Sequence, residues 1–159
     1  MLHNSLIAVH ALAALISLVA GSLLVFVPRY FTERRLFDVY LWSLAAMVVF
    51  LLSAITVGWQ QGDAAQHILF SGLSLLALFM LYRAMQARQV MEVRPSGWRA
   101  TYVDHIGFTL ISLVAGFIIV AAIRLGVPGL IIAVVAIAAL LAGRRAIEMA
   151  KSRLRQALS

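Results

Sequence analysis

The sequence contains no cysteine among its 159 residues. Disulfide bonds, thiolate metal ligands and cysteine nucleophiles are therefore excluded. Acidic residues are also scarce, with 6 Asp and Glu against 13 Lys and Arg. The chain has no paired carboxylates, no glycine-rich phosphate loop, and neither a His-Glu-x-x-His nor a Gly-x-Ser-x-Gly motif. The sequence thus lacks the signatures of the common hydrolytic and nucleotide-binding enzymes.

Charged residues of either sign are few, at 12% of the chain, whereas 64% of the residues are hydrophobic and the mean hydropathy is +1.00. Soluble domains carry about 25% charged and 45–50% apolar residues. The composition therefore predicts a small integral membrane protein whose main partner is the lipid bilayer.

Five apolar runs are long enough to cross a hydrocarbon core of about 30 Å. They cover residues 5–28, 39–59, 65–82, 101–123 and 127–143. The first is too long, and too polar at its start, for a removable signal peptide. We therefore expect an all-α transmembrane bundle of five spans, or of four if the short fifth run is re-entrant.

The basic residues indicate the orientation of these spans. All 13 Lys and Arg residues except Arg124 follow the first, third or fifth run. By the positive-inside rule, the N-terminus lies outside and the C-terminus in the cytoplasm, as in a multi-pass protein of the bacterial inner membrane. Tyr40, Trp98 and Tyr102 are expected near the inner interface. Because no soluble domain presents the positive charge, we expect no nucleic-acid partner.

The last residues form a basic segment. We divide the chain into a transmembrane bundle, residues 1–143, and a cytoplasmic amphipathic tail, residues 144–159. Ile147 and Ala150 share one helical face of the tail, with several basic residues off that face. This pattern is typical of a helix on the anionic inner leaflet. A solvated positive stop after the last span is the alternative interpretation.

A repeated unit stands out from this background. Residues 10–29 and 105–124 both contain the word Leu-Ile-Ser-Leu-Val-Ala-Gly, with a histidine five residues before it and an arginine eight residues after it. In a helix the histidine, serine and glycine of each copy share one face. The two copies run antiparallel in the five-span arrangement. Small residues at this spacing let membrane helices approach closely. Helix packing alone therefore explains this shared face as well as a binding site does.

Histidines inside a membrane are rare and point to a site when they face the bundle. Two imidazoles at one depth can ligate a b-type haem, exchange protons with a quinone, or bind Cu or Zn. We expect a cofactor site in the outer leaflet at His10, His67, Ser17, Gly21 and Ser71. A metal site would combine His10 and His67 with His3.

A second group of polar residues lies at the inner end of the fourth run. Asp104, His105 and Thr109 are a candidate proton-handling cluster there. The alternative is that Asp104 lies in the first helical turn, where the helix dipole favours a carboxylate, and pairs with a neighbouring arginine.

Three elements carry a family resemblance. They are His10 with Gly21, the Leu81-Tyr82-Arg83-Ala84 segment with the basic loop after it, and Gly97-Trp98 leading to His105. The chain resembles uncharacterised bacterial multi-span inner-membrane proteins with a histidine-bearing domain of unknown function. That resemblance implies a fold and a location, and it brings no established activity.

Two functions remain open from the sequence. The first is a redox protein that binds haem b or a quinone through the outer-leaflet histidines. The second is a non-enzymatic accessory or scaffold subunit, in which the small-residue faces serve only helix packing. Other membrane subunits, or a second copy of the chain, are the expected protein partners.

Overall fold

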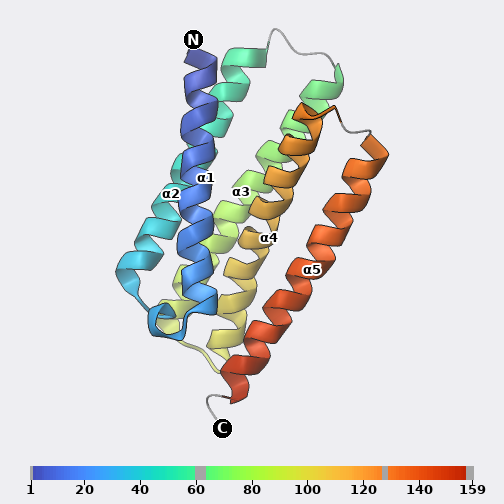
Figure 1. Cartoon of the computed structure of the whole chain (residues 1–159). Coiled ribbons are helices and arrows are strands. Elements are labelled where there is room, and N and C mark those ends of the chain that lie inside the picture. Colours follow the sequence, from blue (N-terminus) through green and yellow to red (C-terminus); the bar gives the residue numbers. More distant parts are fainter. Residues whose placement is uncertain (1, 60–63, 127–128, 157–159) are drawn as a thin grey trace.

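The computed structural model of the chain describes residues 2–59, 64–126 and 129–156, and these residues form helices joined by short connections (Figure 1). In chain order the helices are α1 (Leu2–Phe26), the short 3-10 helix η1 (Pro28–Tyr30), α2 (Arg34–Gly58), α3 (Ala64–Val93), α4 (Trp98–Arg124) and α5 (Gly129–Gln156). No strand occurs in the described residues. The predicted all-α class is confirmed.

Local sequence explains the two described turns between long helices. Pro28 begins η1 one residue after the end of α1, in a position where its missing N–H costs no helical hydrogen bond. The connection from α3 to α4 contains Arg94 with φ 50° and Gly97 with φ 71°. Glycine adopts this left-handed conformation without a steric penalty, so Gly97 suits a sharp reversal before α4.

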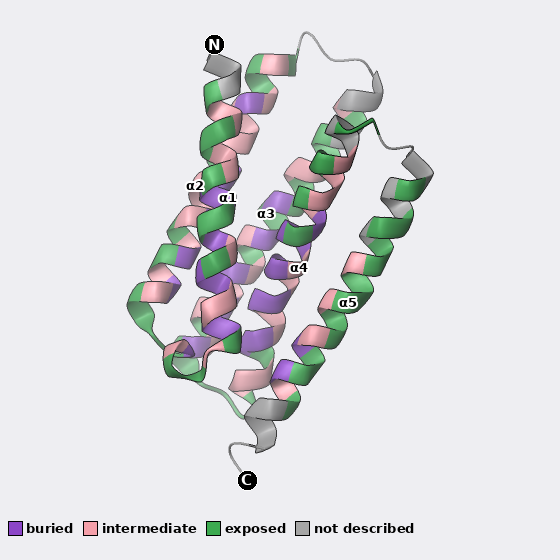
Figure 2. Ribbon diagram, in the orientation of Figure 1, coloured by how far each residue is buried: buried purple, intermediate pink, exposed green. Residues whose placement is uncertain are grey.

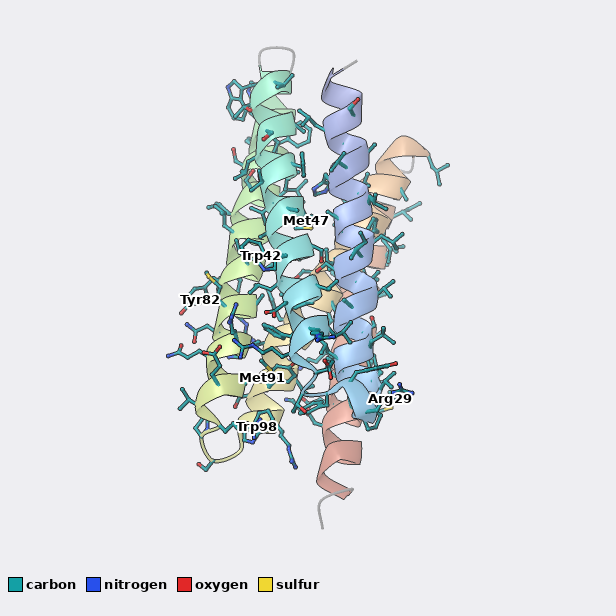
Figure 3. The ribbon with its side chains drawn as sticks, turned by 90° about the vertical axis from the view of Figure 1, so that its left-hand side faces the viewer. Arg29, Trp42, Met47, Tyr82, Met91 and Trp98 are labelled. Carbon is teal, nitrogen blue, oxygen red and sulfur yellow. The ribbon has the colours of Figure 1, made fainter. Side chains whose placement is uncertain are left out.

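Successive long helices run antiparallel, so the two chain termini lie at opposite ends of the bundle (Figure 1). Helix α1 packs on α2 and α4, α3 packs on α2 and α4, and α5 packs on α4. We call the end that holds η1, the α3–α4 connection and the C-terminal turns of α5 the basic end. Figure 3 places Arg29, Met91 and Trp98 at this end.

The core lies in the half of the bundle toward the basic end (Figure 2). Leu24, Leu44, Ala84 and Ile106 are fully buried there. Toward the opposite end, side chains of α3 such as Ile68 are strongly exposed. The closely packed part of the interior, where neighbours fix the orientation of a side chain, therefore lies near the basic end.

Among the described residues, four helical segments are long and apolar enough to cross a membrane: Ser5–Phe26, Arg34–Gly58, Phe70–Val93 and Trp98–Ala122. The expected fifth span falls in α5, and the structure does not describe the side chains of several residues there. The number of spans and the orientation of the termini stay predictions.

The boundary expected between residues 143 and 144 falls inside α5, which continues without a break to Gln156. Ile147 and Ala150, the apolar residues expected on the face of the tail, are 7% and 8% exposed. Here they pack within the protein, against α4. The division into a transmembrane bundle and a cytoplasmic tail stays a prediction about which residues lie in the membrane.

Two of the aromatic side chains expected at the inner interface lie in the core. Tyr40 and Tyr102 are both 0% exposed. Tyr102 packs edge-on against Phe31 at 5.2 Å between ring centroids, and Phe37 lies 5.7 Å from Tyr40. Neighbouring helices cover both rings, and the expected depth of these residues near the inner interface stays a prediction.

Candidate functional site

The repeated unit becomes two antiparallel helices that contact each other. Gly21, the last residue of the seven-residue word in the first copy, faces Leu110, the first residue of that word in the second copy, and a Cβ at Gly21 would lie 2.9 Å from Leu110 Cδ2. The corresponding contact on the other side does not form: Gly116 has no such neighbour within 4 Å, and Leu15 is 50% exposed. The two copies are alike in sequence and different in their surroundings.

Tyr40 of α2 occupies the place where the small faces of α1 and α4 meet. Its hydroxyl donates a hydrogen bond to Thr109 Oγ1, and the Thr109 hydroxyl in turn donates to the carbonyl of Ile106 at 2.7 Å. Ser17 donates to the Tyr40 carbonyl at 3.4 Å, and the Tyr40 ring lies 3.1 Å from the Cβ position of Gly21. The space that the small residues leave is thus filled by a tyrosine of the protein itself.

The histidines expected in the outer leaflet lie in the half of the bundle opposite the basic end. His10 is half-buried and donates from Nδ1 to the Met47 carbonyl at 2.9 Å. His67 donates from Nε2 to the Trp59 carbonyl at 2.8 Å and stacks on the Trp59 ring at 4.2 Å. His10 therefore bonds to α2, and His67 bonds to the residue that follows α2.

The remaining residues of the expected outer-leaflet site do not gather around these histidines. Ser17 and Gly21 face Tyr40, whereas Ser71 is exposed. His3 lies in α1, and its side chain is outside the described part of the structure. No group of three His, Cys, Asp or Glu side chains suited to a metal occurs among the described residues.

The inner cluster divides in two. Thr109 points toward Tyr40, whereas Asp104 points toward α5 and forms an ion pair with Lys151. Lys151 also pairs with Glu148 at 3.1 Å. The expectation that Asp104 pairs with a neighbouring arginine is wrong, since its carboxylate meets a lysine of α5, while Arg83 reaches the Asp104 backbone carbonyl at 3.2 Å. Asp104 also lies beyond the first turn of α4, which begins at Trp98.

The ion pairs affect the charge state of Lys151. Burial lowers the pKa of its ammonium, but hydrogen bonds and attraction to Asp104 and Glu148 raise it, and the net pKa lies above the ordinary lysine value. Lys151 is therefore positively charged at neutral pH and joins the last turns of α5 to α4.

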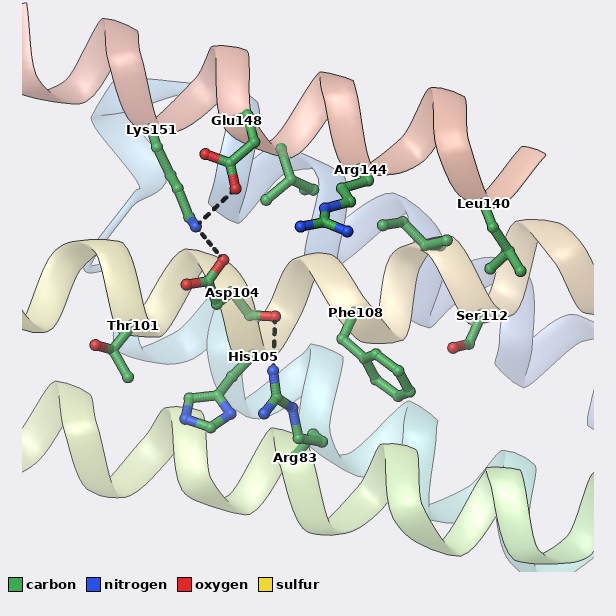
Figure 4. A pocket seen from close by; sticks show the side chains of 12 residues that line it. Arg83, Thr101, Asp104, His105, Phe108, Ser112, Leu140, Arg144, Glu148 and Lys151 are labelled. Atoms are coloured by element: carbon green, nitrogen blue, oxygen red, sulfur yellow. Dashed lines mark hydrogen bonds and ion pairs between the residues drawn. The ribbon is translucent and has the colours of Figure 1, made fainter. Parts of the chain in front are cut away.

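These residues border a groove of about 630 Å³ between α3, α4 and α5 at the basic end (Figure 4). Helix α4 contributes residues between Thr101 and Ser112, α3 contributes Arg83, and α5 contributes residues between Leu140 and Lys151. His105 lines the groove on its α3 side, and its Nδ1 is buried without a hydrogen-bond partner among the described residues. In this groove, cationic side chains and the Phe108 ring surround open space.

Sequence reasoning missed the roles of Tyr40 and Arg83. The signal for Tyr40 is its spacing from Phe37, Leu44 and Met47, which places all four on one helical face. Arg83 follows an apolar run and looks like an ordinary positive-inside residue. No pattern in the sequence distinguishes it from the exposed arginines nearby.

Comparison of the chain with protein-family models, with curated proteins and with solved structures gives no match.

Proposed function

We propose that this protein is a non-enzymatic integral membrane protein, an accessory or scaffold subunit, in which the small-residue faces of α1 and α4 serve helix packing. One observation carries the proposal: Tyr40 fills the space between these faces and bonds to Thr109 on one of them. A flat cofactor needs that space empty. Close packing of small residues and hydroxyl hydrogen bonds between helices are the ordinary interactions of membrane bundles.

The location belongs to the same proposal. We infer a bacterial inner membrane, with the basic end in the cytoplasm, because the basic residues gather at that end. The absence of native cysteine makes single-cysteine labelling a direct test. Ser152→Cys is expected to react with a membrane-impermeant maleimide only after cell lysis, and Ser5→Cys in intact spheroplasts. The opposite labelling pattern would show that the basic end lies outside the cell, and it would contradict the proposed orientation.

A redox cofactor is the second candidate, and one observation favours it. The Nδ1–H group of His10 donates to a backbone carbonyl, so the neutral ring keeps Nε2 free as a ligand. Haem b, a quinone or a metal ion would use this nitrogen, with His67 as the other ligand. Helices α1 and α3 share no substantial interface among the described residues, so the two histidines need a bridging group or a rearrangement to act together.

An absorption spectrum of the detergent-purified protein distinguishes the two candidates. The packing proposal expects a colourless protein with sub-stoichiometric metal, before and after dithionite. A Soret band that shifts on reduction and is lost in both His10→Ala and His67→Ala would overturn it. His105→Ala is the matched control, because this histidine lies near the basic end and is expected to leave the spectrum unchanged.

A further inference from the structure

The groove at the basic end carries more positive charge than its carboxylates balance. Asp104 and Glu148 both pair with Lys151. Arg83 and Arg144 also line the groove, and neither has a carboxylate partner in the described part of the chain. Two guanidinium groups, one from α3 and one from α5, therefore face the same space without a counter-ion (Figure 4).

Two buried nitrogen atoms of the groove also lack a hydrogen-bond partner among the described residues. Arg83 Nη2 donates to the Asp104 carbonyl and its guanidinium lies over the Phe108 ring at 5.4 Å, but its Nε is buried without a partner among the described residues. The Nδ1 atom of His105 is likewise buried without a hydrogen-bond partner among the described residues. Buried polar atoms of native proteins normally have partners, so the unpaired Nε–H donor of Arg83 favours a ligand that brings an acceptor into the groove.

The groove changes from polar to apolar along its length. Arg83, Asp104 and Lys151 lie toward the basic end, whereas Ile111 and Leu140 line the part nearer the middle of the bundle. Along α4 the lining extends over twelve residues, from Thr101 to Ser112, which is about 16 Å of helix. A ligand that follows this groove is anionic at one end and apolar at the other.

We propose that the groove binds an anionic phospholipid. Its phosphate accepts hydrogen bonds from the guanidinium groups of Arg83 and Arg144, which suit the oxygens of a phosphate. One acyl chain lies along Phe108, Ile111 and Leu140. Basic pockets between membrane helices at the cytoplasmic side bind lipid headgroups by this chemistry. The site goes beyond the packing function proposed above and does not depend on it.

Lipid binding by the full chain tests the proposal. The protein is purified in a neutral detergent, titrated with phosphatidylglycerol or with phosphatidylcholine, and followed by native mass spectrometry. Wild type is expected to bind phosphatidylglycerol more tightly than phosphatidylcholine. Arg83→Gln and Arg144→Gln are each expected to weaken phosphatidylglycerol binding about fivefold, the effect of removing one basic residue from an anionic headgroup.

Arg145→Gln is the matched control, because Arg145 is exposed, adjacent to Arg144 and outside the groove lining. It is expected to retain wild-type affinity. Equal affinity in Arg144→Gln, Arg145→Gln and wild type would overturn the proposal. Arg144 is itself exposed, so this comparison holds even if Arg83→Gln does not fold.

An inorganic phosphate arm distinguishes the lipid from a free anion. Phosphate added at millimolar concentration is expected to leave phosphatidylglycerol binding unchanged, because it lacks the acyl chain that lies along the apolar lining. Displacement of the lipid by phosphate at that concentration would assign the site to a free phosphate and overturn the lipid assignment.

Discussion

The repeated unit provides a matched pair of substitutions, because Gly21 and Gly116 end identical seven-residue words in opposite surroundings. A Cβ at Gly21 would lie 2.9 Å from Leu110 Cδ2 and 3.1 Å from two carbons of the Tyr40 ring. Leu110 is 5% exposed and Tyr40 is fully buried, so neither side chain has free space to enter. At Gly116 no such neighbour lies within 4 Å. We therefore expect Gly21→Ala to destabilise the protein relative to Gly116→Ala.

The magnitude follows from two opposing contributions. Overpacking of a filled core costs about 1–3 kcal/mol. Alanine is about 1 kcal/mol better than glycine inside a helix. Gly116→Ala gains only the second contribution, and Gly21→Ala carries both. The helix contribution is common to the two variants, so the difference between their free energies of unfolding is the overpacking cost alone, about 1–3 kcal/mol.

The assay is equilibrium unfolding in mixed micelles of a mild detergent and SDS, followed by circular dichroism. Wild type, Gly21→Ala and Gly116→Ala are compared under one set of conditions. Equal stability of the two variants would refute the asymmetry of the α1–α4 contact. A larger loss in Gly116→Ala than in Gly21→Ala would mean that the second copy holds the close approach.

Three further predictions use the same unfolding assay. Tyr40→Phe removes the hydroxyl that bonds to α4 and is expected to cost about 1 kcal/mol, whereas Tyr82→Phe, at an exposed ring, is expected to change stability by less than about 0.5 kcal/mol. Lys151→Met removes both ion pairs at the end of α5, with an expected loss of about 1 kcal/mol at neutral pH. Since the pKa of Lys151 is raised in the folded protein, its contribution is complete below the ordinary lysine pKa. The contribution is lost as pH rises through the raised value, and a gap between Lys151→Met and wild type that stays constant in alkali would contradict this assignment. Gly107→Ala places a Cβ 2.5 Å from Ile147 Cδ1 and is expected to cost about 1–3 kcal/mol; wild-type stability would exclude the close approach of α4 and α5.

Apolar run length and composition are sufficient to predict the helical class and the approximate position of each helix, because they depend on local sequence. The antiparallel direction of the two repeat copies also follows from an odd number of reversals between them. Which residues of the two copies contact other helices does not follow from the sequence. Two identical words receive different neighbours because Tyr40 approaches from a third helix, and its position depends on how α2 packs against α1.

The candidate site shows the same limit. The spacing of His10, Ser17 and Gly21 correctly predicts a shared face, as Ser17 and Gly21 both meet Tyr40. Spacing carries no information on whether that face encloses a ligand or a side chain. Arg83 and Lys151 are 68 positions apart in the sequence, and only the packing of α3 and α5 on α4 brings them to one groove.

Helix α5 differs from the other long helices in having one substantial neighbour, α4, among the described contacts, whereas each of the others has at least two. Release of α5 therefore breaks a single interface and leaves the packing around Tyr40 intact. Local opening of a protein begins with the elements that have the fewest buried contacts. We therefore expect α5 to open from α4 while the packing of α1 to α4 on one another is kept. Amide hydrogen exchange in α5 is expected to be faster than in α2, which makes this opening observable without any substitution.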